Sequence, residues 1–326
     1  MVRALQPLYD RWSSSLAVLA YHRVLPVEHV DTYPFDLDLI SATPTQFEYQ
    51  MAYLRRYFNP VSLADVVAHL DGIRPLPKRA VAVTFDDGYC DTHRYAFPIL
   101  QRYSIPSTVF VTTGYVDSGE PFWFEVAAYL ALRAAPGTLE LAGCGQPLLT
   151  GESASDRRRG VRALQATLKT LPNSRRTAIV AEWSRQFAAQ ADEDALALSR
   201  PLSWSQIEEL ASGGVAFGSH SVTHPNLTQL ADAELEWELV ESKRTLEARL
   251  QRPVLTLAYP IGTSEAFDER VAAATRHAGF RLGISYIRGG NSLAAIDPFG
   301  LRRHGVERDH SRAYFRAMTT LPSWFT

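Results

Sequence analysis

The sequence is poor in several features that define whole classes of protein. It has 2 cysteines in 326 residues, Cys90 and Cys144, so no disulfide framework is implied. Cys90 is best interpreted as a small buried hydrophobic residue. The formal net charge is −2, which gives no sign of a nucleic-acid-binding surface. No internal repeat or low-complexity segment is present, and a composition that is 46% hydrophobic is ample for a sizeable core.

Long hydrophobic runs are also missing. The apolar run at 16–21 is too short to span a membrane or to form the apolar part of a secretory signal, and residues 1–15 contain no such part either. We therefore expect no transmembrane segment, a cytoplasmic location and at most a peripheral association with a membrane.

One strong pattern is a β-prone run that ends in two adjacent carboxylates. Residues 80–85 are followed by Asp86, Asp87 and Gly88. Neighbouring side chains on a strand point to opposite faces, so both carboxylates can share one pocket only where the strand ends. Buried carboxylates are costly unless they are paired, hydrogen-bonded or bound to a cation. The pair therefore indicates a metal, a proton-transfer role or both, although such a sequence is also ordinary turn chemistry.

A second apolar run is followed by two histidines. Residues 215–217 precede Gly218, and His220 and His224 come next. This spacing lets two imidazoles converge over one helical turn, while Pro225 prevents a longer regular helix. A lone histidine is more often structural than a ligand, but two at this spacing, with an aspartate pair elsewhere, favour a metal site.

Together these motifs resemble the polysaccharide deacetylase family, metal-dependent carbohydrate esterases that remove N-acetyl groups from sugars. The motifs are T-F-D-D-G at 84–88 and S-H-S-V-T-H-P-N-L at 219–227. The segment L-A-Y-H-R-V-L-P at 19–26 resembles the first strand of the family, and L-A-Y-P-I-G at 257–262 resembles its Y-P-x-G loop. The resemblance spans about residues 17–310.

The resemblance implies an α/β fold, a distorted parallel (β/α) barrel of about seven strands within a single domain, 1–326. A helical insertion is expected at 114–200, where apolar residues recur at helical spacing. Trp123, at the start of one such helix, is interpreted as a core residue, with sugar stacking as the alternative. The rest of the chain alternates between the two kinds of element, as parallel βαβ units do. Strands are expected near 16–25, 80–85 and 108–112, and helices near 45–56, 63–70 and 96–103.

The resemblance also implies roles for individual residues. It assigns Asp87, His220 and His224 as metal ligands and Asp86 as the general base. The backbone N–H of Tyr259 is the implied donor to the oxyanion. Zn²⁺ is the expected metal because the ligands mix nitrogen and oxygen, with Co²⁺, Ni²⁺ or Fe²⁺ as alternatives.

The chain departs from the family at two points. Many members have an arginine where this chain has Ala258. Many also have a late catalytic histidine, where this chain reads L-R-R-H-G-V at 301–306. Either Arg303 or His304 could point into the site, and resemblance to the exopolysaccharide-type subgroup favours Arg303. Candidates for protonating the leaving amine are His22, at the end of the first strand, and a metal-bound water.

The function expected is hydrolysis of the N-acetyl or other N-acyl group of an amino sugar in a polysaccharide, an oligosaccharide or a glycoconjugate precursor. The alternatives are hydrolysis of a non-sugar linear or cyclic amide, an inactive carbohydrate-binding barrel and a metal phosphohydrolase. The intact ligand set argues against a binding protein, and the lack of a phosphate-cradling glycine loop argues against the phosphohydrolase.

Overall fold

The computed structural model describes residues 14–27, 29–135, 137–139 and 148–325, and the fold is that of these residues. The predictions made for residues 1–13 and for Cys144 lie outside them. None of the helices described combines the length and the apolarity needed to cross a bilayer.

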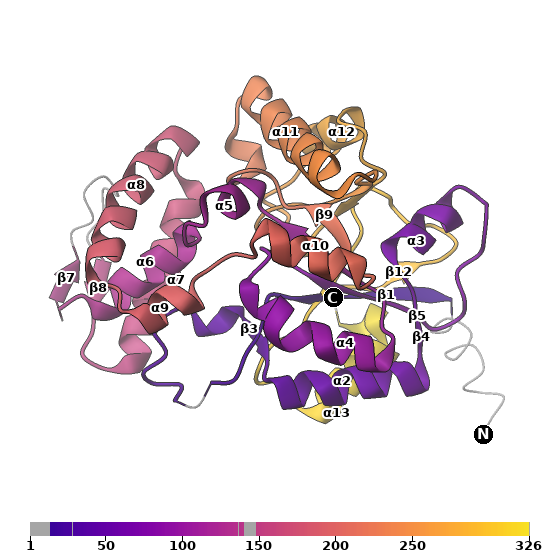
Figure 1. Ribbon diagram of the computed structural model, residues 1–326, viewed down its shortest axis with the longest axis horizontal. Coiled ribbons are helices and arrows are strands. Elements are labelled where there is room, and N and C mark those ends of the chain that lie inside the picture. The colour runs from indigo at the N-terminus through magenta and orange to yellow at the C-terminus, as the bar shows by residue number, and fades with distance from the viewer. Residues whose placement is uncertain (1–13, 28, 136, 140–147, 326) are drawn as a thin grey trace.

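A strongly curled, mostly parallel sheet forms the centre of the molecule (Figure 1). Its strands are β1 (Ser15–Tyr21), β4 (Asn59–Pro60), β5 (Ala80–Phe85), β6 (Ser107–Val111), β9 (Ala216–Ser219), β10 (Thr256–Ala258), β11 (Leu282–Ile284), β12 (Asn291–Ser292) and β13 (His304–Gly305). In the described residues their order is β11-β10-β9-β6-β5-β1-β12, with β13 also on β1 and β4 also on β5.

The two ends of the parallel sheet are connected through the segment at 301–305. Leu301 bridges to Ile284 of β11, and His304 then pairs in parallel with Leu19 of β1. Seven parallel strands, β1, β5, β6, β9, β10, β11 and β13, therefore curl around a common centre. The predicted distorted parallel barrel of about seven strands is confirmed.

Both faces of the strands are buried, which is why their sequences are continuously apolar. Along β5, Val81, Val83 and Phe85 belong to the cluster that packs under the surrounding helices, whereas Ala80 and Ala82 belong to a second cluster. That second cluster takes residues from β1, β6, β10 and β11 as well, so it fills the barrel interior.

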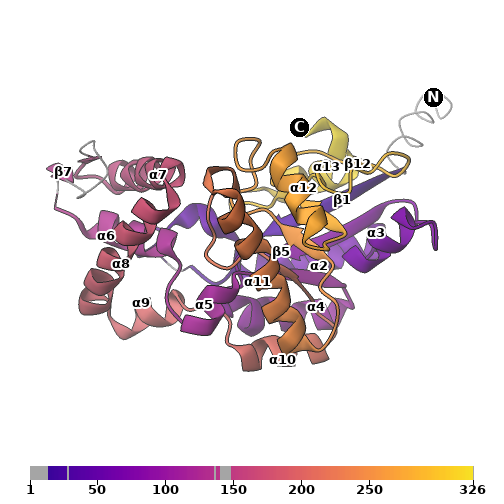
Figure 2. The same ribbon diagram turned by 90° about the horizontal axis from the view of Figure 1, so that it is seen from above.

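Helices cover the outside of this sheet (Figures 1 and 2). The predicted helix near 63–70 begins after Ser62, whose side chain accepts a hydrogen bond from the N–H of Asp65. The covering helices are α2 (Pro44–Tyr57), α3 (Leu63–Leu70), α4 (Phe97–Tyr103), α10 (Trp204–Ser212), α11 (Asp232–Leu250), α12 (Glu269–His277) and α13 (Arg312–Thr320), and short elements join them at η1 (Leu37–Leu39), η2 (Thr92–Ala96), η3 (Leu227–Gln229), η4 (Pro322–Trp324), β2 (Arg23–Val24) and β3 (Ile40–Ala42).

The segment between β6 and β9 is mostly helical, and its helices within 123–198 lie to one side of the barrel in both views (Figures 1 and 2). It has its own apolar cluster, to which Phe35 from the first long connection also contributes. Trp123 is only 1% exposed, so it is a core residue and not a sugar-stacking one. The assignment of 1–326 to a single domain with 114–200 as an insertion within it stays a prediction, and the word insertion is used below only as a name for the helical segment at 113–198. The elements of this segment are α5 (Thr113–Ser118), α6 (Trp123–Arg133), β7 (Gly137–Leu139), β8 (Leu148–Thr150), α7 (Ala154–Thr170), α8 (Asn173–Gln190) and α9 (Glu193–Leu198).

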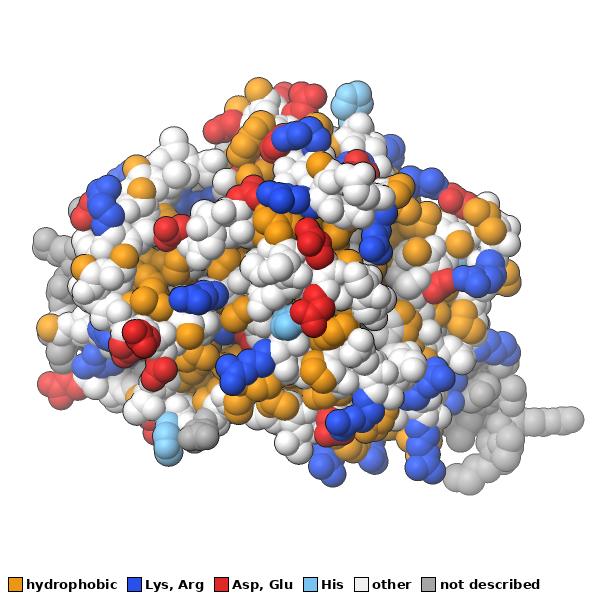
Figure 3. Space-filling model, in the orientation of Figure 1, with side chains coloured by type: hydrophobic (Ala, Val, Ile, Leu, Met, Phe, Trp, Pro, Cys, Tyr) orange, Lys and Arg blue, Asp and Glu red, His pale blue; other side chains and the backbone are white. Residues whose placement is uncertain are grey.

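The surface carries no dominant charge on the face shown in Figure 3. Acidic and basic side chains are interspersed there, with hydrophobic side chains between them. This agrees with a formal net charge of −2 for the whole chain.

Candidate metal centre

The candidate site lies at the carboxyl ends of the barrel strands. His22 directly follows β1, Asp86 follows β5, His220 follows β9 and Tyr259 follows β10. Because the strands are parallel, these ends meet at one rim of the barrel, the usual place for the active site of a parallel β/α barrel. The topology therefore brings together residues that lie far apart in the sequence.

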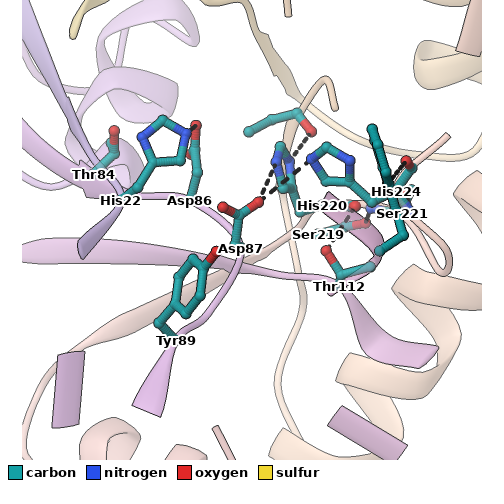
Figure 4. A network of polar contacts seen from close by, with 12 residues as sticks. His22, Thr84, Asp86, Asp87, Tyr89, Thr112, Ser219, His220, Ser221 and His224 are labelled. Atoms are coloured by element: carbon teal, nitrogen blue, oxygen red, sulfur yellow. Dashed lines mark hydrogen bonds and ion pairs between the residues drawn. The ribbon is translucent and has the colours of Figure 1, made fainter. Parts of the chain in front are cut away.

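Asp87, His220 and His224 converge at this rim (Figure 4). The Nε2 atoms of His220 and His224 lie 3.5 and 3.4 Å from Oδ1 of Asp87, and all three side chains are buried. Ligand atoms held at zinc-like distances of about 2.0–2.2 Å in a tetrahedron lie about 3.4 Å apart. These residues therefore form a buried group that fits a divalent metal ion.

The electrostatics of the three side chains also suit a cation. Burial, followed by the negative charges of Asp86 and Glu125, raises the pKa of the Asp87 carboxyl well above its ordinary value. Burial lowers the pKa values of His220 and His224, so both imidazoles are neutral, the form that binds a metal. A cation would stabilise the charged carboxylate and could accept the lone pairs of both rings.

Hydrogen bonds orient the two histidines. Nδ1 of His220 lies 2.8 Å from the carbonyl oxygen of Ala258, which leaves Nε2 free to face Asp87. The carbonyl oxygen of His224 accepts hydrogen bonds from Nε1 of Trp123 at 3.3 Å and from Nη1 of Arg176 at 2.8 Å. Both bonds come from the helical insertion, so the insertion helps to place one of the ligands.

The loops that carry the ligands adopt unusual backbone conformations. Asp87, Ser221 and His224 have φ values of 68°, 67° and 54°, in the left-handed region that residues other than glycine seldom occupy. The carboxylate of Glu238 holds the histidine loop by accepting the N–H of Val222 at 2.7 Å and of Thr223 at 3.0 Å. Such strain is characteristic of functional sites whose surroundings enforce the geometry.

Asp86 is engaged by an arginine. Nη1 and Nη2 of Arg303 lie 2.6 and 2.8 Å from its two carboxylate oxygens, a bidentate pair that is almost fully buried. Burial alone would raise the pKa of Asp86, but Arg303, followed by His220, outweighs it and lowers the pKa. Arg303 therefore reaches the site as favoured above. The Nε2 atom of His304, the next residue, makes no hydrogen bond within the described residues.

His22 lies beside Asp86. Its Nε2 atom is 4.0 Å from Oδ2 of Asp86, and its ring packs against Tyr286 with centroids 5.5 Å apart. Burial lowers the pKa of His22 to about 4, although the charge of Asp86 opposes this shift. The imidazole is therefore neutral near pH 7.

The geometry does not support the oxyanion role expected for Tyr259. Its backbone N–H donates to the carbonyl oxygen of Ile284 at 3.0 Å, as part of the pairing between β10 and β11, so this donor is already used. Ile261 lies two residues later, lines the cavity and has a φ of 67°. Its N–H makes no hydrogen bond within the part of the chain described. The flanking Pro260 and Gly262 are the sequence signal that could have indicated this turn.

Behind the loop that carries Asp87 lies a buried ion network that the sequence analysis missed. Arg23 donates from Nε to Asp91 at 2.8 Å and from Nη1 to Glu125 at 2.9 Å. The hydroxyl of Tyr89, two residues after Asp87, also donates to Glu125, at 2.9 Å. The network therefore ties the Asp87 loop to α6 of the insertion.

The site opens into a cavity of about 640 Å³. Its floor includes His22, Asp86 and the three candidate ligands, and its walls come from the connection before α2, the insertion helix α7 and the loop before α13. Substrate would therefore contact the insertion as well as the barrel. The wall residues include Asp36, Leu37, Asp38, Phe124, Arg162, Gln165, Lys169, Ile261, Tyr286, Glu307, Arg308 and Asp309.

The sequence is similar to those of known deacetylases. Residues 73–283 match the profile of a family described as polysaccharide deacetylase. The chain is 34% identical over 91 residues to the poly-β-1,6-N-acetyl-D-glucosamine N-deacetylase of Escherichia coli strain K12, covering 28% of this chain and 14% of that protein. It is 28% identical over 109 residues to the protein of the same name from Staphylococcus aureus strain MSSA476, covering 32% of this chain and 38% of that protein.

Solved structures share the fold. The Streptococcus pyogenes deacetylase PplD, in complex with acetate, matches with a TM-score of 0.62 and 19% identity, covering 94% of this chain and 98% of that one. IcaB from Ammonifex degensii matches with a TM-score of 0.57 and 20% identity, covering 95% and 97%. The BpsB deacetylase domain from Bordetella bronchiseptica matches with a TM-score of 0.55 and 19% identity, covering 91% and 97%.

Proposed function

Because the chain belongs to the polysaccharide deacetylase family, we propose that it is a metal-dependent amidohydrolase that removes the N-acetyl group from an amino sugar. The amino sugar would be part of a polysaccharide, an oligosaccharide or a glycoconjugate precursor. The observation that carries this proposal is the convergence of Asp87, His220 and His224 beside a second carboxylate, Asp86, on the floor of an open cavity.

Asp87, His220 and His224 would hold the metal, and Zn²⁺ suits their mixed nitrogen and oxygen donors. When bound, such an ion polarises a carbonyl oxygen and lowers the pKa of a coordinated water.

Asp86 is the group that accepts a proton from the attacking water. The bidentate contact with Arg303 fixes the direction of its carboxylate and keeps it ionised. The backbone N–H of Ile261 is the donor that we assign to the developing oxyanion, because it makes no hydrogen bond within the described residues, whereas the N–H of Tyr259 is paired with Ile284.

The leaving amine needs a proton, and His22 is the residue placed to deliver it. Because its pKa is about 4, His22 is neutral near pH 7 and must first receive a proton. Asp86, with Oδ2 4.0 Å from Nε2 of His22, is the neighbour that acquires one during attack. The two side chains would thus pass a proton from the water to the amine.

The direct test measures metal content and acetate release on the same protein. Purified chain loaded with Zn²⁺ is incubated with N-acetylated chitooligosaccharides, nucleotide-linked sugars and lipid-linked sugars. We expect acetate from at least one class, and loss of activity after chelation. A metal-loaded protein that releases acetate from none of them would contradict deacetylation.

A further inference from the structure

One face of helix α7 borders the cavity. Arg162, Gln165, Ala166 and Lys169 line it, at spacings of three and four residues that place them on one side of the helix. The carbonyl oxygen of Lys169 accepts a hydrogen bond of 3.4 Å from Nδ2 of Asn226, two residues after the candidate ligand His224. The end of α7 that carries Lys169 is therefore attached to the loop that carries His220 and His224.

Two positive side chains of the cavity wall, Lys169 and Arg308, lack a directly bonded counter-charge among the described residues. Arg162 pairs with Asp38 at 3.3 Å, but Lys169 and Arg308 make no ion pair and no side-chain hydrogen bond within the described residues. Nε of Arg308 is buried without a partner. Lys169 is half-buried, and this burial lowers the pKa of its ammonium group. Both charges are thus partly desolvated and unpaired, although the more distant carboxylates of Asp36 and Asp87 partly offset the effect of burial on the pKa of Lys169.

The carboxylates of the wall are mostly occupied elsewhere. Asp38 is held by Arg162, and Glu307 is held by Arg288 at 2.7 Å. Asp36 accepts the N–H of Asp38 at the start of η1, and Asp309 is exposed to solvent.

The backbone of Arg308 is fixed in place. Its N–H donates to the carbonyl oxygen of Ile40 at 3.2 Å, and its carbonyl oxygen accepts Nε2 of Gln46 at 3.0 Å. A cation on a fixed backbone that faces a cavity is preorganised for a ligand, because little further ordering is needed when the ligand binds.

We propose that Lys169 and Arg308 bind an anionic group of the substrate, a phosphate or a carboxylate, next to the amino sugar whose amide lies over Asp86. The inference rests on the proposed function and narrows its substrate class. Partly buried charges are costly unless paired, and charge-assisted hydrogen bonds to phosphate or carboxylate are among the strongest in proteins. The substrate would be a sugar phosphate, a glycosyl diphosphate or a glycan containing a uronic acid.

The test compares neutral and anionic substrates. The Zn²⁺-loaded protein is given neutral chitotetraose, UDP-N-acetylglucosamine, and a disaccharide of glucuronic acid and N-acetylglucosamine. We expect a higher kcat/KM for at least one anionic substrate than for chitotetraose. Comparing the two anionic substrates distinguishes recognition of phosphate from recognition of carboxylate. Lys169→Met should then lower kcat/KM by about 10- to 100-fold on that substrate, mainly through KM, and by less than about 2-fold on chitotetraose. Arg308→Met should likewise lower kcat/KM more on the anionic substrate than on chitotetraose.

Lys78→Met is the matched control, since Lys78 is exposed just before β5, at the opposite end of the strand from the site. This variant should leave kcat/KM unchanged on both the neutral and the anionic substrates. Equal kcat/KM for neutral and anionic substrates, or equal losses on both in Lys169→Met, would overturn the inference and leave deacetylation standing.

A binding measurement separates this inference from the proposed function. Calorimetry with N-acetylglucosamine 1-phosphate and with N-acetylglucosamine is carried out on the wild type and on Lys169→Met. We expect tighter binding of the phosphate by the wild type and loss of that difference in the variant. If no sugar releases acetate, the proposed function fails, and this binding difference alone decides whether the anion site exists.

Discussion

Two adjacent aspartates occupy different positions because their backbones and partners differ. Asp86 continues the strand and meets Arg303, whereas Asp87 turns into the left-handed region and faces two histidines. Their variants should therefore fail in different ways.

Asp86→Asn should retain metal and lose turnover. The amide keeps the size and polarity of the side chain but cannot accept the proton, so kcat should fall by about 10²-fold or more. Acetate release and metal content are measured on the same samples. Near-normal turnover would show that the proton goes elsewhere, with His22 as the next residue to test.

Asp87→Asn should lose metal first. A neutral ligand weakens metal affinity, so activity should be low at stoichiometric Zn²⁺ and should partly return when Zn²⁺ is in excess. Metal titration followed by an activity assay gives the answer. Unchanged metal affinity would remove Asp87 from the ligand set.

Helix α6 contributes a buried glutamate, Glu125, that accepts hydrogen bonds from Arg23 of β2 and from Tyr89 of the loop after β5. Glu125 is fully buried, and burial raises its pKa from 4.5 to about 7, although Arg23 opposes the shift. The folded protein therefore holds a proton on Glu125 at pH values where the unfolded chain has lost it. The stability associated with that proton is fully present below about pH 4.5 and is lost as the pH rises through about 7.

Glu125→Gln should remove this pH dependence. The difference in unfolding free energy, variant minus wild type, should rise between pH 4.5 and 7 by a few kcal/mol, since a tenfold change in proton affinity corresponds to about 1.4 kcal/mol. Urea unfolding is followed at a series of pH values in EDTA, so that metal loading does not vary. Glu236→Gln, at an exposed position of α11, is the control. Parallel pH profiles for Glu125→Gln and the wild type would contradict the assignment.

At the scale of the whole molecule, the metal should stabilise the fold, because its ligands come from two distant loops. We expect about one divalent ion per chain. A ligand at 100 times its Kd adds about 2.7 kcal/mol to the unfolding free energy. Thermal unfolding with and without Zn²⁺ measures this gain, and elemental analysis measures the content. In His220→Ala both the gain in stability and the bound metal should be lost. A His220→Ala protein with full metal content would refute the proposed ligand set.

Much of this architecture can be predicted from the sequence, for physical reasons. Parallel strands buried on both faces have continuous apolar sequences, so β5 was predicted with its correct ends. Residue types and spacing favoured a metal near the two histidines and the aspartate pair, and the family resemblance singled out Asp87 as the third ligand. A cytoplasmic location and peripheral membrane association stay predictions.

Other features depend on the fold itself. Whether Arg303 or His304 faces the site is set by the register of β13 on β1, since a shift of one residue would exchange the two side chains. The network of Arg23 joins residues 68 and 102 positions apart, which no local pattern reveals. The use of the Tyr259 N–H in strand pairing is likewise visible only once β11 lies beside β10.

The pairing of Asp86 with Arg303 also has a consequence in time. The two residues are 217 positions apart, and a ribosome that adds roughly 5–20 residues per second takes roughly 10–40 seconds to cover that distance. During this interval the emerging chain has its aspartates but not the guanidinium that orients one of them. On the proposed function, the nascent protein would therefore be latent, and catalysis would begin only after residues 301–305 have paired beside the first strand.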